Sequence, residues 1–459
     1  MKVVQVLLDG LGDRTYAALD HQTPLEAART PNLDKLAEMG MNGVFHAGSP
    51  GRCFPSETAH FSMFGYDLAA FPGRGLLEAS GAGIAFDDAD VLVLAHLSGV
   101  RMVPEPETGR GMLVLAYGRD DIPGKREAMG RYFNDLTPWA CGGFRFTLHQ
   151  TGRNDAILAI KATDGGRASP DISDSDPVGI GMPMGRITAL AESPEPQSAM
   201  MSADALNQYL CWCYERLDAA GDAGKQYGAN HRSGVRGNFL ATQRAGRRVP
   251  LEPFVEKWGF RAAMIASGSV YQGLARELGM GFVRAADTGS PGTDLAGRIE
   301  LALADTAYDF IHVHTKAPDE ASHKGDPLVK TRVIEELDQG LAGLLQALES
   351  GNQDLLAVVT ADHSTPARQK LIHSGESVPV VMAGGAIRQD RVERFDEISA
   401  VRGSAGFLRG DELMHMILNC TNRAVLDGLR LGSVRRPYRH TAYRPFVVEN
   451  REPESSRGS

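Results

Sequence analysis

Runs of apolar residues along the chain predict buried parallel strands, each leading to a residue suited to chemistry. Residues 2–8, KVVQVLL, are almost continuously apolar and end at Asp9. The same pattern returns in YDFIHVHTK, which leads to Asp319, and in DLLAVVTADHS, which leads to Asp362 and His363. VPVVMAGG follows as another apolar run. Because such runs are typical of strands covered on both faces, they predict an α/β core.

The hydrophobic pattern changes between residues 91 and 195, where short runs such as VLVLAHLSGV and FRFTLHQ are separated by turn-forming residues. We expect an inserted α+β domain there, with AESPEPQS as its exit linker. The core then comprises residues 1–90 and 196–425. Residues 426–459 form a basic tail whose end, ENREPESSRGS, has a composition typical of disorder. The predicted fold is a doubly wound, mostly parallel sheet with a smaller inserted domain.

Composition narrows the class of protein. The chain has 459 residues, a net charge of −9 and a pI near 5.8, which give no electrostatic footprint for nucleic acid. Five cysteines without a regular framework indicate a reducing compartment. The N-terminus enters an apolar strand at once, and we see no signal peptide or membrane-spanning run. We therefore expect a cytoplasmic protein with no membrane and no nucleic-acid partner.

The residues at the strand ends form a candidate metal-binding set, because chemistry in α/β sheets gathers outside the carboxyl ends of the strands. Asp319 and His323 are four apart, so a helix would put them on one face. Asp362 and His363 are adjacent and would serve one ion together if the strand has ended, or two ions otherwise. Oxygen and imidazole donors without a thiolate favour Mn²⁺, with Zn²⁺ or Mg²⁺ as alternatives. The set is Asp9, Asp319, His323, Asp362, His363 and His373.

Ser56 lies in CFPSETAHFSMFGYD, where a loop gives way to a helix-like run. No Gly-x-Ser-x-Gly elbow surrounds it, and its neighbours supply no hydrolase triad. It fits a helix N-cap as well as a nucleophile. Next to a metal-binding set we interpret it as a nucleophile, because a bound cation would lower the pKa of its hydroxyl without a histidine base. His60, four residues later, suits a buried helix position and a site position equally.

Several stretches together resemble one family. LLDGLGDR, TPLEAARTPNLDKLAEMG, PSETAHFSMFGYD, SPDISDSDP, HTKAPDEASHKGD and TADHSTPARQKLIHSGESVPV are similar to the archaeal-type cofactor-independent phosphoglycerate mutases of the alkaline phosphatase superfamily. The resemblance extends to about residue 420. It implies an alkaline-phosphatase-like fold and the glycolytic interconversion of 2-phosphoglycerate and 3-phosphoglycerate. It also implies a phosphoserine intermediate, two divalent ions and no requirement for 2,3-bisphosphoglycerate.

The same resemblance implies roles for individual residues. Ser56 would take the phosphoryl group. Lys316 could be a solvated lysine at a strand end, but its place three residues before Asp319 favours a contact with the phosphoryl group. One ion would be held by Asp9, Ser56, Asp362 and His363, and the other by Asp319, His323 and His373. NHRSGVRGNF and ATQRAGRRVP resemble the family segment that contributes basic groups. The candidate substrate contacts are Arg153, Arg232, Arg236 and Arg244.

The chain departs from the family in the predicted insertion. The family has an arginine pair in an RRAGR-like stretch, whereas SGVRMVPEPETGRGM carries only Arg101 and Arg110 at the comparable place. An alternative function is therefore a metal-dependent phosphomonoester or phosphonate hydrolase acting on another small acid. A non-catalytic binding protein is disfavoured, because every proposed ligand is retained. Either enzyme would take a small phosphorylated acid, and a homo-oligomer is left open.

Overall fold

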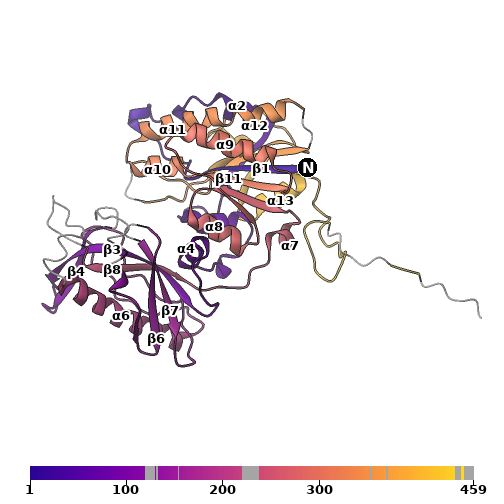
Figure 1. Cartoon of the computed structure of the whole chain (residues 1–459). Coiled ribbons are helices and arrows are strands. Elements are labelled where there is room, and N and C mark those ends of the chain that lie inside the picture. Colours follow the sequence, from indigo (N-terminus) through magenta and orange to yellow (C-terminus); the bar gives the residue numbers. More distant parts are fainter. Residues whose placement is uncertain are drawn as a thin grey trace, which may run out of the picture.

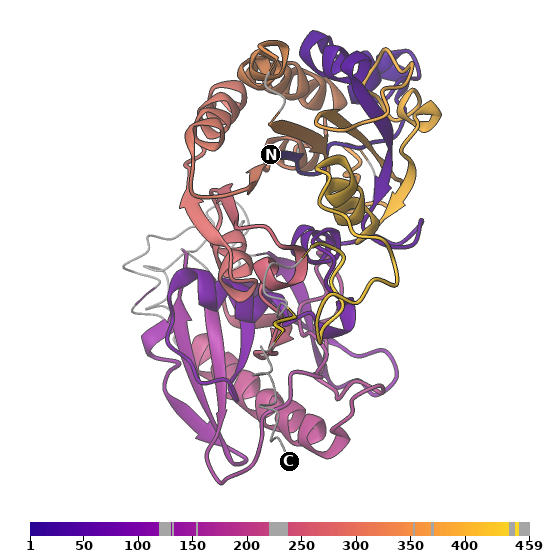
Figure 2. The same cartoon turned by 90° about the vertical axis from the view of Figure 1, so that its right-hand side faces the viewer.

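The protein has two lobes, each built around its own β-sheet (Figures 1 and 2). The computed structural model describes residues 1–118, 130, 133–152, 155–219, 237–351, 354–368, 371–439 and 446–448. Two large clusters of buried apolar side chains accompany the two sheets. We call the lobes the core domain and the second domain.

The core domain contains an eight-stranded sheet in the order β10-β9-β11-β1-β12-β13-β2-β14. Its strands pair in parallel except at β13, which is antiparallel to both of its neighbours. The expected mostly parallel sheet is therefore confirmed. The strand bounds are β1 Lys2–Leu8, β2 Gly40–His46, β9 Ala262–Ala266, β10 Gly281–Arg284, β11 Phe310–Thr315, β12 Leu355–Thr360, β13 Val378–Gly384 and β14 Gly406–Arg409.

Helices cover both faces of this sheet, as expected of a doubly wound fold. In Figure 1, α2, α9, α11 and α12 lie above the sheet, and α8 with α4 lies below it. The α-helix bounds are α1 Pro24–Ala27, α2 Pro31–Met39, α3 Ser56–Met63, α4 Arg74–Ala82, α7 Phe254–Trp258, α8 Ser269–Glu277, α9 Pro291–Ala304, α10 Ala317–His323, α11 Pro327–Gly340, α12 Ala342–Glu349 and α13 Glu412–Cys420. The 3-10 helices are η1 Ala17–Leu19, η2 Leu68–Ala70 and η5 Ala400–Arg402.

The second domain contains a six-stranded antiparallel sheet with one long helix packed against it. Its strand order is β4-β3-β7-β6-β5, and β8 pairs with β3. The long strand β3 pairs with β7 and β8 through its first part and with β4 through its second part. The bounds are β3 Val91–Pro104, β4 Gly111–Tyr117, β5 Trp139–Cys141, β6 Phe144–Gln150, β7 Asp155–Ala162, α6 Pro196–Ala219 and β8 Phe239–Gly246.

The second domain extends beyond the boundary at residue 195 that the sequence suggested. Helix α6 buries Leu206, Tyr209 and Cys213 in the apolar cluster of the second domain. Strand β8 continues the same sheet, with Leu240 opposite Leu97. The sequence predicted both elements in the core domain, but the structure has them in the second domain. The acidic, proline-containing segment before α6 is a loop within the second domain.

The two domains meet where the chain returns to the core. Helix α4 packs against β3 and β8 on one side and against α8 on the other. At the start of α4, Gly73 has a φ of 87° and its Cα faces the backbone of Gly246. A side chain at either position would collide with the other backbone. These two glycines therefore let the returning chain run directly against the core.

The first part of the basic tail packs on the core domain. The Tyr438 hydroxyl donates to the carbonyl oxygens of Val255 and Glu256, at 3.2 and 2.9 Å. Arg436 forms an ion pair with Glu252. The expected disorder at the end of the tail concerns residues 449–459, which lie outside the described residues. Among the helices in the described part of the chain, none has the length and apolar character needed to span a membrane.

Truncating Leu206 to alanine should destabilise the second domain by about 2–5 kcal/mol, because it leaves a cavity between α6 and the second sheet. Hydrogen-exchange mass spectrometry on the full chain should show faster exchange in peptides from β3, β6 and β7. Peptides from β1, β11 and β12 should keep their wild-type protection. Faster exchange in the core strands alone would place α6 back in the core domain.

Candidate metal centre and active site

The candidate site lies at the carboxyl ends of three neighbouring strands, β11, β1 and β12. Asp9 follows β1, and its backbone N–H donates to Thr315 at the end of β11. Its carbonyl oxygen accepts from the backbone N–H of Asp319, 3.0 Å away. Asp362 comes two residues after β12 ends. Backbone pairing therefore brings together three carboxylates that are far apart in the sequence.

A buried lysine ties together the loops that carry these carboxylates. The Lys330 ammonium, on α11, donates to the carbonyl oxygens of Gly10, Gly12 and Thr365 at 2.9–3.0 Å. It also forms an ion pair with Asp13 at 3.0 Å. Burial lowers the pKa of Lys330, and the Asp13 carboxylate opposes that shift. One ammonium therefore fixes the loop after β1 against the loop after β12.

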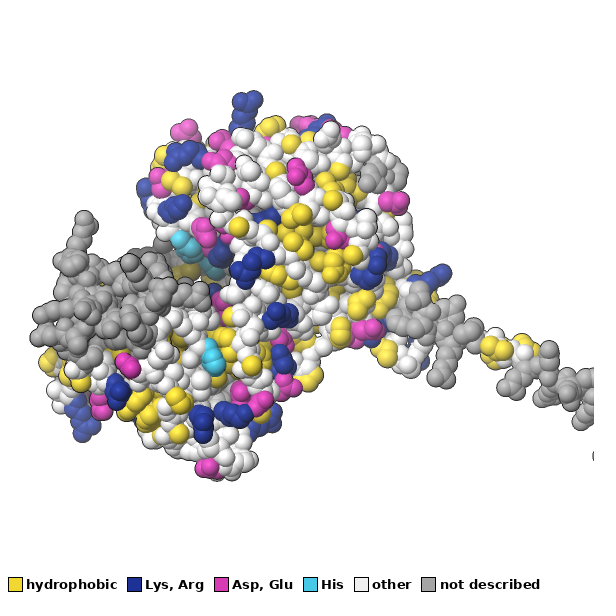
Figure 3. All heavy atoms as spheres, in the orientation of Figure 1, with side chains coloured by type: hydrophobic (Ala, Val, Ile, Leu, Met, Phe, Trp, Pro, Cys, Tyr) yellow, Lys and Arg dark blue, Asp and Glu magenta, His cyan; other side chains and the backbone are white. Residues whose placement is uncertain are grey.

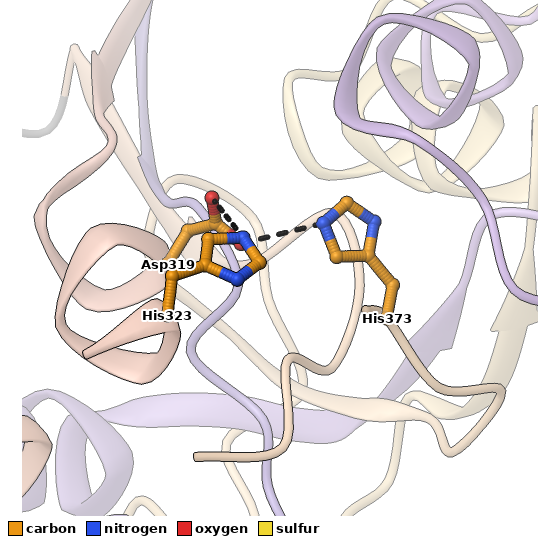
Figure 4. A group of neighbouring side chains, drawn as sticks. All are labelled: Asp319, His323 and His373. Carbon is orange, nitrogen blue, oxygen red and sulfur yellow. Dashed lines mark ion pairs between the residues drawn. The ribbon is translucent and has the colours of Figure 1, made fainter. Parts of the chain in front are cut away.

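One candidate metal group consists of Asp319, His323 and His373. The Nε2 atom of His323 lies 3.3 Å from one carboxylate oxygen of Asp319, and that of His373 lies 3.4 Å from the other. Figure 4 shows the two imidazoles approaching the carboxylate from different segments of the chain. The Nδ1 atom of His373 is 2.7 Å from the Phe54 carbonyl oxygen. As Nδ1 donates there, the Nε2 lone pair is left for a ligand.

A second group surrounds Ser56, which is buried at the start of α3. Its Oγ lies 3.3 Å from Asp9 Oδ1 and 3.1 Å from His363 Nε2. His363 Nε2 is 3.2 Å from Asp362 Oδ2, a buried oxygen that accepts no hydrogen bond from the described residues. Since β12 has ended at Thr360, Asp362 and His363 can both face Ser56. The end of β12 thus meets the condition under which the sequence predicts that both residues serve one ion.

The two groups are adjacent. Asp9, Asp319 and His363 also have ligand atoms close enough to share an ion, so Asp319 belongs to both sets. The set implied by the resemblance has Asp362, and not Asp319, together with Asp9 and His363. In the structure both carboxylates lie close to His363. Oxygen and imidazole donors without a thiolate suit Mn²⁺, Zn²⁺ or Mg²⁺. Each proposed ligand from the sequence thus lies in one contiguous site.

The charges of the site also favour divalent cations. Burial raises the pKa of Asp362 well above its usual range, and the Asp9 carboxylate adds to the rise. Burial would likewise raise the pKa of Asp319, but the contacts with His323 and His373 and the Lys316 charge together hold that pKa far below its usual range. Burial lowers the pKa of His363 to about 3. Metal ions bind imidazoles and carboxylates in their deprotonated forms.

Lys316 lies at the mouth of this site, directly before α10. Its ammonium donates to Ser56 Oγ at 3.2 Å and contacts Asp9 and Asp319 at 3.3 and 3.1 Å. About a third of its side chain is exposed. Lys316 therefore lies directly beside the Ser56 hydroxyl. In the space-filling view, histidine, basic and acidic side chains gather at the waist between the two lobes (Figure 3).

Arg244 brings a positive charge from the second domain to the same region. It lies on β8 with a φ of 56°, and its guanidinium contacts the Glu57 carboxylate at 2.8 Å. Glu57 directly follows Ser56 and also pairs with Arg74 at 3.5 Å. Arg101 and Arg110 are exposed. The other candidate substrate contacts, Arg153, Arg232 and Arg236, lie outside the described residues.

Sequence reasoning missed several residues that contact the site. Tyr271 and His314 both contact Asp9, and Thr365 donates to Asp319 at 2.8 Å. Two histidines spaced i, i+2 in the apolar run HVHTK were the available signal for His314. The sequence around Tyr271 carried no comparable signal. His60 is fully buried, with Nδ1 2.7 Å from the Ser56 carbonyl oxygen, so it fits both of the positions considered for it.

Comparisons with known proteins show the family to which the chain belongs. Residues 1–420 match the Metalloenzyme superfamily. The chain is 40% identical over 450 residues to the 2,3-bisphosphoglycerate-independent phosphoglycerate mutase 2 of Methanocaldococcus jannaschii, covering 95% of this chain and 97% of that protein.

Two solved structures share the fold at 26% identity. The PH0037 protein of Pyrococcus horikoshii has a TM-score of 0.71, with 93% of this chain and 99% of that chain covered. The cofactor-independent phosphoglycerate mutase of Thermoplasma acidophilum has a TM-score of 0.58, with 92% and 100% covered. Fold and site thus define a member of the Metalloenzyme superfamily. Within it, the chain belongs to the family of 2,3-bisphosphoglycerate-independent phosphoglycerate mutases.

Replacing His323 or His373 with alanine should reduce the metal content from two ions per chain to one, because each change removes a donor from the same group. Elemental analysis of Mn²⁺-loaded, desalted protein measures this directly. His415→Ala is the matched control, since His415 is exposed and pairs only weakly with Asp411 at 3.8 Å. Two ions retained in both site variants would contradict the grouping.

Metal binding should release more protons at mildly acidic than at mildly alkaline pH. Burial and Asp9 raise the pKa of Asp362, so a cation must displace its proton below that pKa but not above it. Metal affinity should accordingly increase with pH across this range. Calorimetric titrations in two buffers of different ionisation enthalpy give the proton count. Asp362→Asn should lower the proton count, and His373, whose pKa the Asp319 carboxylate raises against the effect of burial, should supply the remainder. Equal counts in the wild type and in Asp362→Asn would refute this role.

Proposed function

We propose that this protein interconverts 2-phosphoglycerate and 3-phosphoglycerate through a phosphoserine at Ser56, with two divalent ions and no 2,3-bisphosphoglycerate. The observation that supports this most is the position of Ser56 Oγ, within 3.1–3.3 Å of His363, Lys316 and Asp9. The names of the curated relatives support the substrate pair.

Two divalent ions, with Mn²⁺ as the preferred one, would supply positive charge that lowers the pKa of the Ser56 hydroxyl and offsets charge on the phosphoryl oxygens. Asp9, Ser56, Asp362 and His363 would hold one, and Asp319, His323 and His373 the other. The donor types fit, and Asp362 Oδ2, for which the described residues supply no hydrogen bond, would gain a partner. The polypeptide fixes where these donors point.

In the first half of the reaction, Ser56 Oγ attacks the phosphorus of the bound substrate. The new bond joins Oγ to phosphorus, the bond to the substrate oxygen breaks, and the proton lost by Ser56 ends on the released hydroxyl of glycerate. Lys316, 3.2 Å from Oγ, would stabilise the negative charge on the transferring group. The N-terminal end of α3, where Ser56 lies, contributes a favourable dipole.

In the second half, the other hydroxyl of the retained glycerate takes the phosphoryl group back from Ser56. Glycerate must therefore stay bound while it changes orientation, and water must stay out. We assign both tasks to the second domain, from which Arg244 reaches Glu57 beside the nucleophile. Arg153, Arg232, Arg236 and Arg244 are our proposed contacts to the acid substrate, because guanidinium groups bind carboxylate and phosphate oxygens with two hydrogen bonds.

Replacing Ser56 with alanine should abolish the mutase reaction, with a loss on the order of 10³-fold or more, because the acceptor of the phosphoryl group is gone. The assay incubates the protein with 3-phosphoglycerate and Mn²⁺ and measures 2-phosphoglycerate and free phosphate separately. Acid quenching of the wild type should leave one phosphate on the peptide that contains CFPSETAH.

Thr58→Ala is the matched control, since Thr58 is the other hydroxyl residue in that peptide and should keep activity. Phosphate found on Thr58, or full turnover by Ser56→Ala, would exclude the serine as the acceptor. Free phosphate as the main product of the wild type would instead favour the hydrolase that the sequence left as an alternative.

A further inference from the structure

The two carboxylate oxygens of Asp9 have different surroundings. Oδ1 faces Ser56 Oγ at 3.3 Å and His363 Nε2 at 3.5 Å, on the side of the candidate metal site. Oδ2 accepts from the Tyr271 hydroxyl and from His314 Nε2, both at 2.9 Å. The Lys316 ammonium lies further from Oδ2, at 3.3 Å. Hydrogen bonds to Oδ2 therefore hold the Asp9 carboxylate in place, and Oδ1 is left facing the candidate metal site.

We propose that Tyr271 and His314 are positioning residues that make Asp9 a one-oxygen ligand of the ion beside Ser56. This inference rests on the proposed metal-dependent function. Two donors on Oδ2 occupy the lone pairs through which the carboxylate could otherwise turn and bind with both oxygens. Held in this way, Oδ1 stays directed toward Ser56 and His363. The pair thus acts on the ion through Asp9, without contact to the substrate.

The two donors are built rigidly into the core domain. His314 lies on β11 opposite Leu7 of β1, and it is completely buried. Tyr271 lies on α8, and its ring centroid is 3.9 Å from that of His314. The His60 ring packs against both, with its centroid 5.2 Å from each. Rings packed on several sides keep one orientation, so the two donors are preorganised whether or not an ion is bound.

The protonation of His314 suits a donor to Asp9. A carboxylate oxygen can only accept a hydrogen bond, and His314 Nε2 lies 2.9 Å from Asp9 Oδ2. Its Nδ1 has no hydrogen-bond partner among the described residues, whereas Nε2 faces the carboxylate. The proton therefore belongs on Nε2. The Tyr271 hydroxyl likewise donates to the same carboxylate oxygen.

A purely structural role would predict a different result. If the pair only satisfied a buried carboxylate, its loss would destabilise the fold and leave the affinity for metal unchanged in molecules that remain folded. A positioning role predicts a selective change, because the ion held by Asp319, His323 and His373 has its own donors. Outer partners of metal ligands typically contribute about 10–100-fold in affinity. Only the ion beside Ser56 should weaken by that factor.

Tyr271→Phe tests this by removing one hydroxyl from the full-length chain. We expect calorimetric titration of the metal-free protein with Mn²⁺ to show one site weakened about 10–100-fold and the other unchanged. Tyr66→Phe is the matched control, because the Tyr66 hydroxyl donates to the backbone carbonyl oxygen of Glu252, away from the site, at 2.8 Å. Circular dichroism of the metal-free variants confirms that they are folded. If folded Tyr271→Phe binds Mn²⁺ at both sites with the affinities of the wild type, the proposal is overturned.

His314 offers an independent pair of variants. The side-chain amide of glutamine can place an N–H near the position of Nε2, whereas methionine has no donor. His314→Gln should therefore keep most of the Mn²⁺ affinity of the site beside Ser56, whereas His314→Met should lose that affinity. Equal affinities in the two variants would overturn the donor role of His314. A wild-type protein that binds no Mn²⁺ would instead overturn the proposed metal function, which keeps the two failures distinguishable.

Discussion

Repulsion among three buried carboxylates is the constraint around which the core domain is organised. Asp9, Asp319 and Asp362 lie at the same edge of the sheet, and Lys316 is the cation in contact with two of them. Such a cluster is costly in a low-dielectric interior unless cations balance it. The fold nevertheless holds it in place through backbone hydrogen bonds from strands on either side of β1. We infer that this cost is accepted because it creates affinity for divalent ions.

The supporting structure around the cluster has two layers of restraint. Lys330 fixes the loops after β1 and β12 through their carbonyl oxygens, so the backbone beneath the carboxylates cannot spread. Tyr271, His314 and Thr365 then fix individual carboxylate oxygens. One residue thus holds the backbone of the carboxylate-bearing loops, and other residues hold the carboxylate side chains. Precise sites usually depend on such outer contacts as much as on the ligands themselves.

The strand ends could be predicted from the sequence because the information is local. Apolar runs that stop at Asp9 and Asp362 show both the strand and the side chain delivered by it. Tyr271 could not be found in this way, because its contact with Asp9 depends on how α8 packs over the sheet. The same reason explains the misplaced domain boundary. An amphipathic helix such as α6 shows that it covers a sheet, but not which sheet, since pairs such as Leu97 with Leu240 are distant in sequence.

The second domain is one uninterrupted stretch of chain, from β3 to β8, that leaves and re-enters the core beside α4. All of the proposed metal ligands lie outside that stretch. The proposed metal ligands and the proposed substrate contacts are therefore encoded in separable parts of the gene. Exchange of the segment between β3 and β8 would bring a new set of substrate contacts to an unchanged metal centre. This arrangement lets a lineage diversify its substrates without rebuilding the costly charged cluster, provided that the close passage at Gly73 and Gly246 is kept.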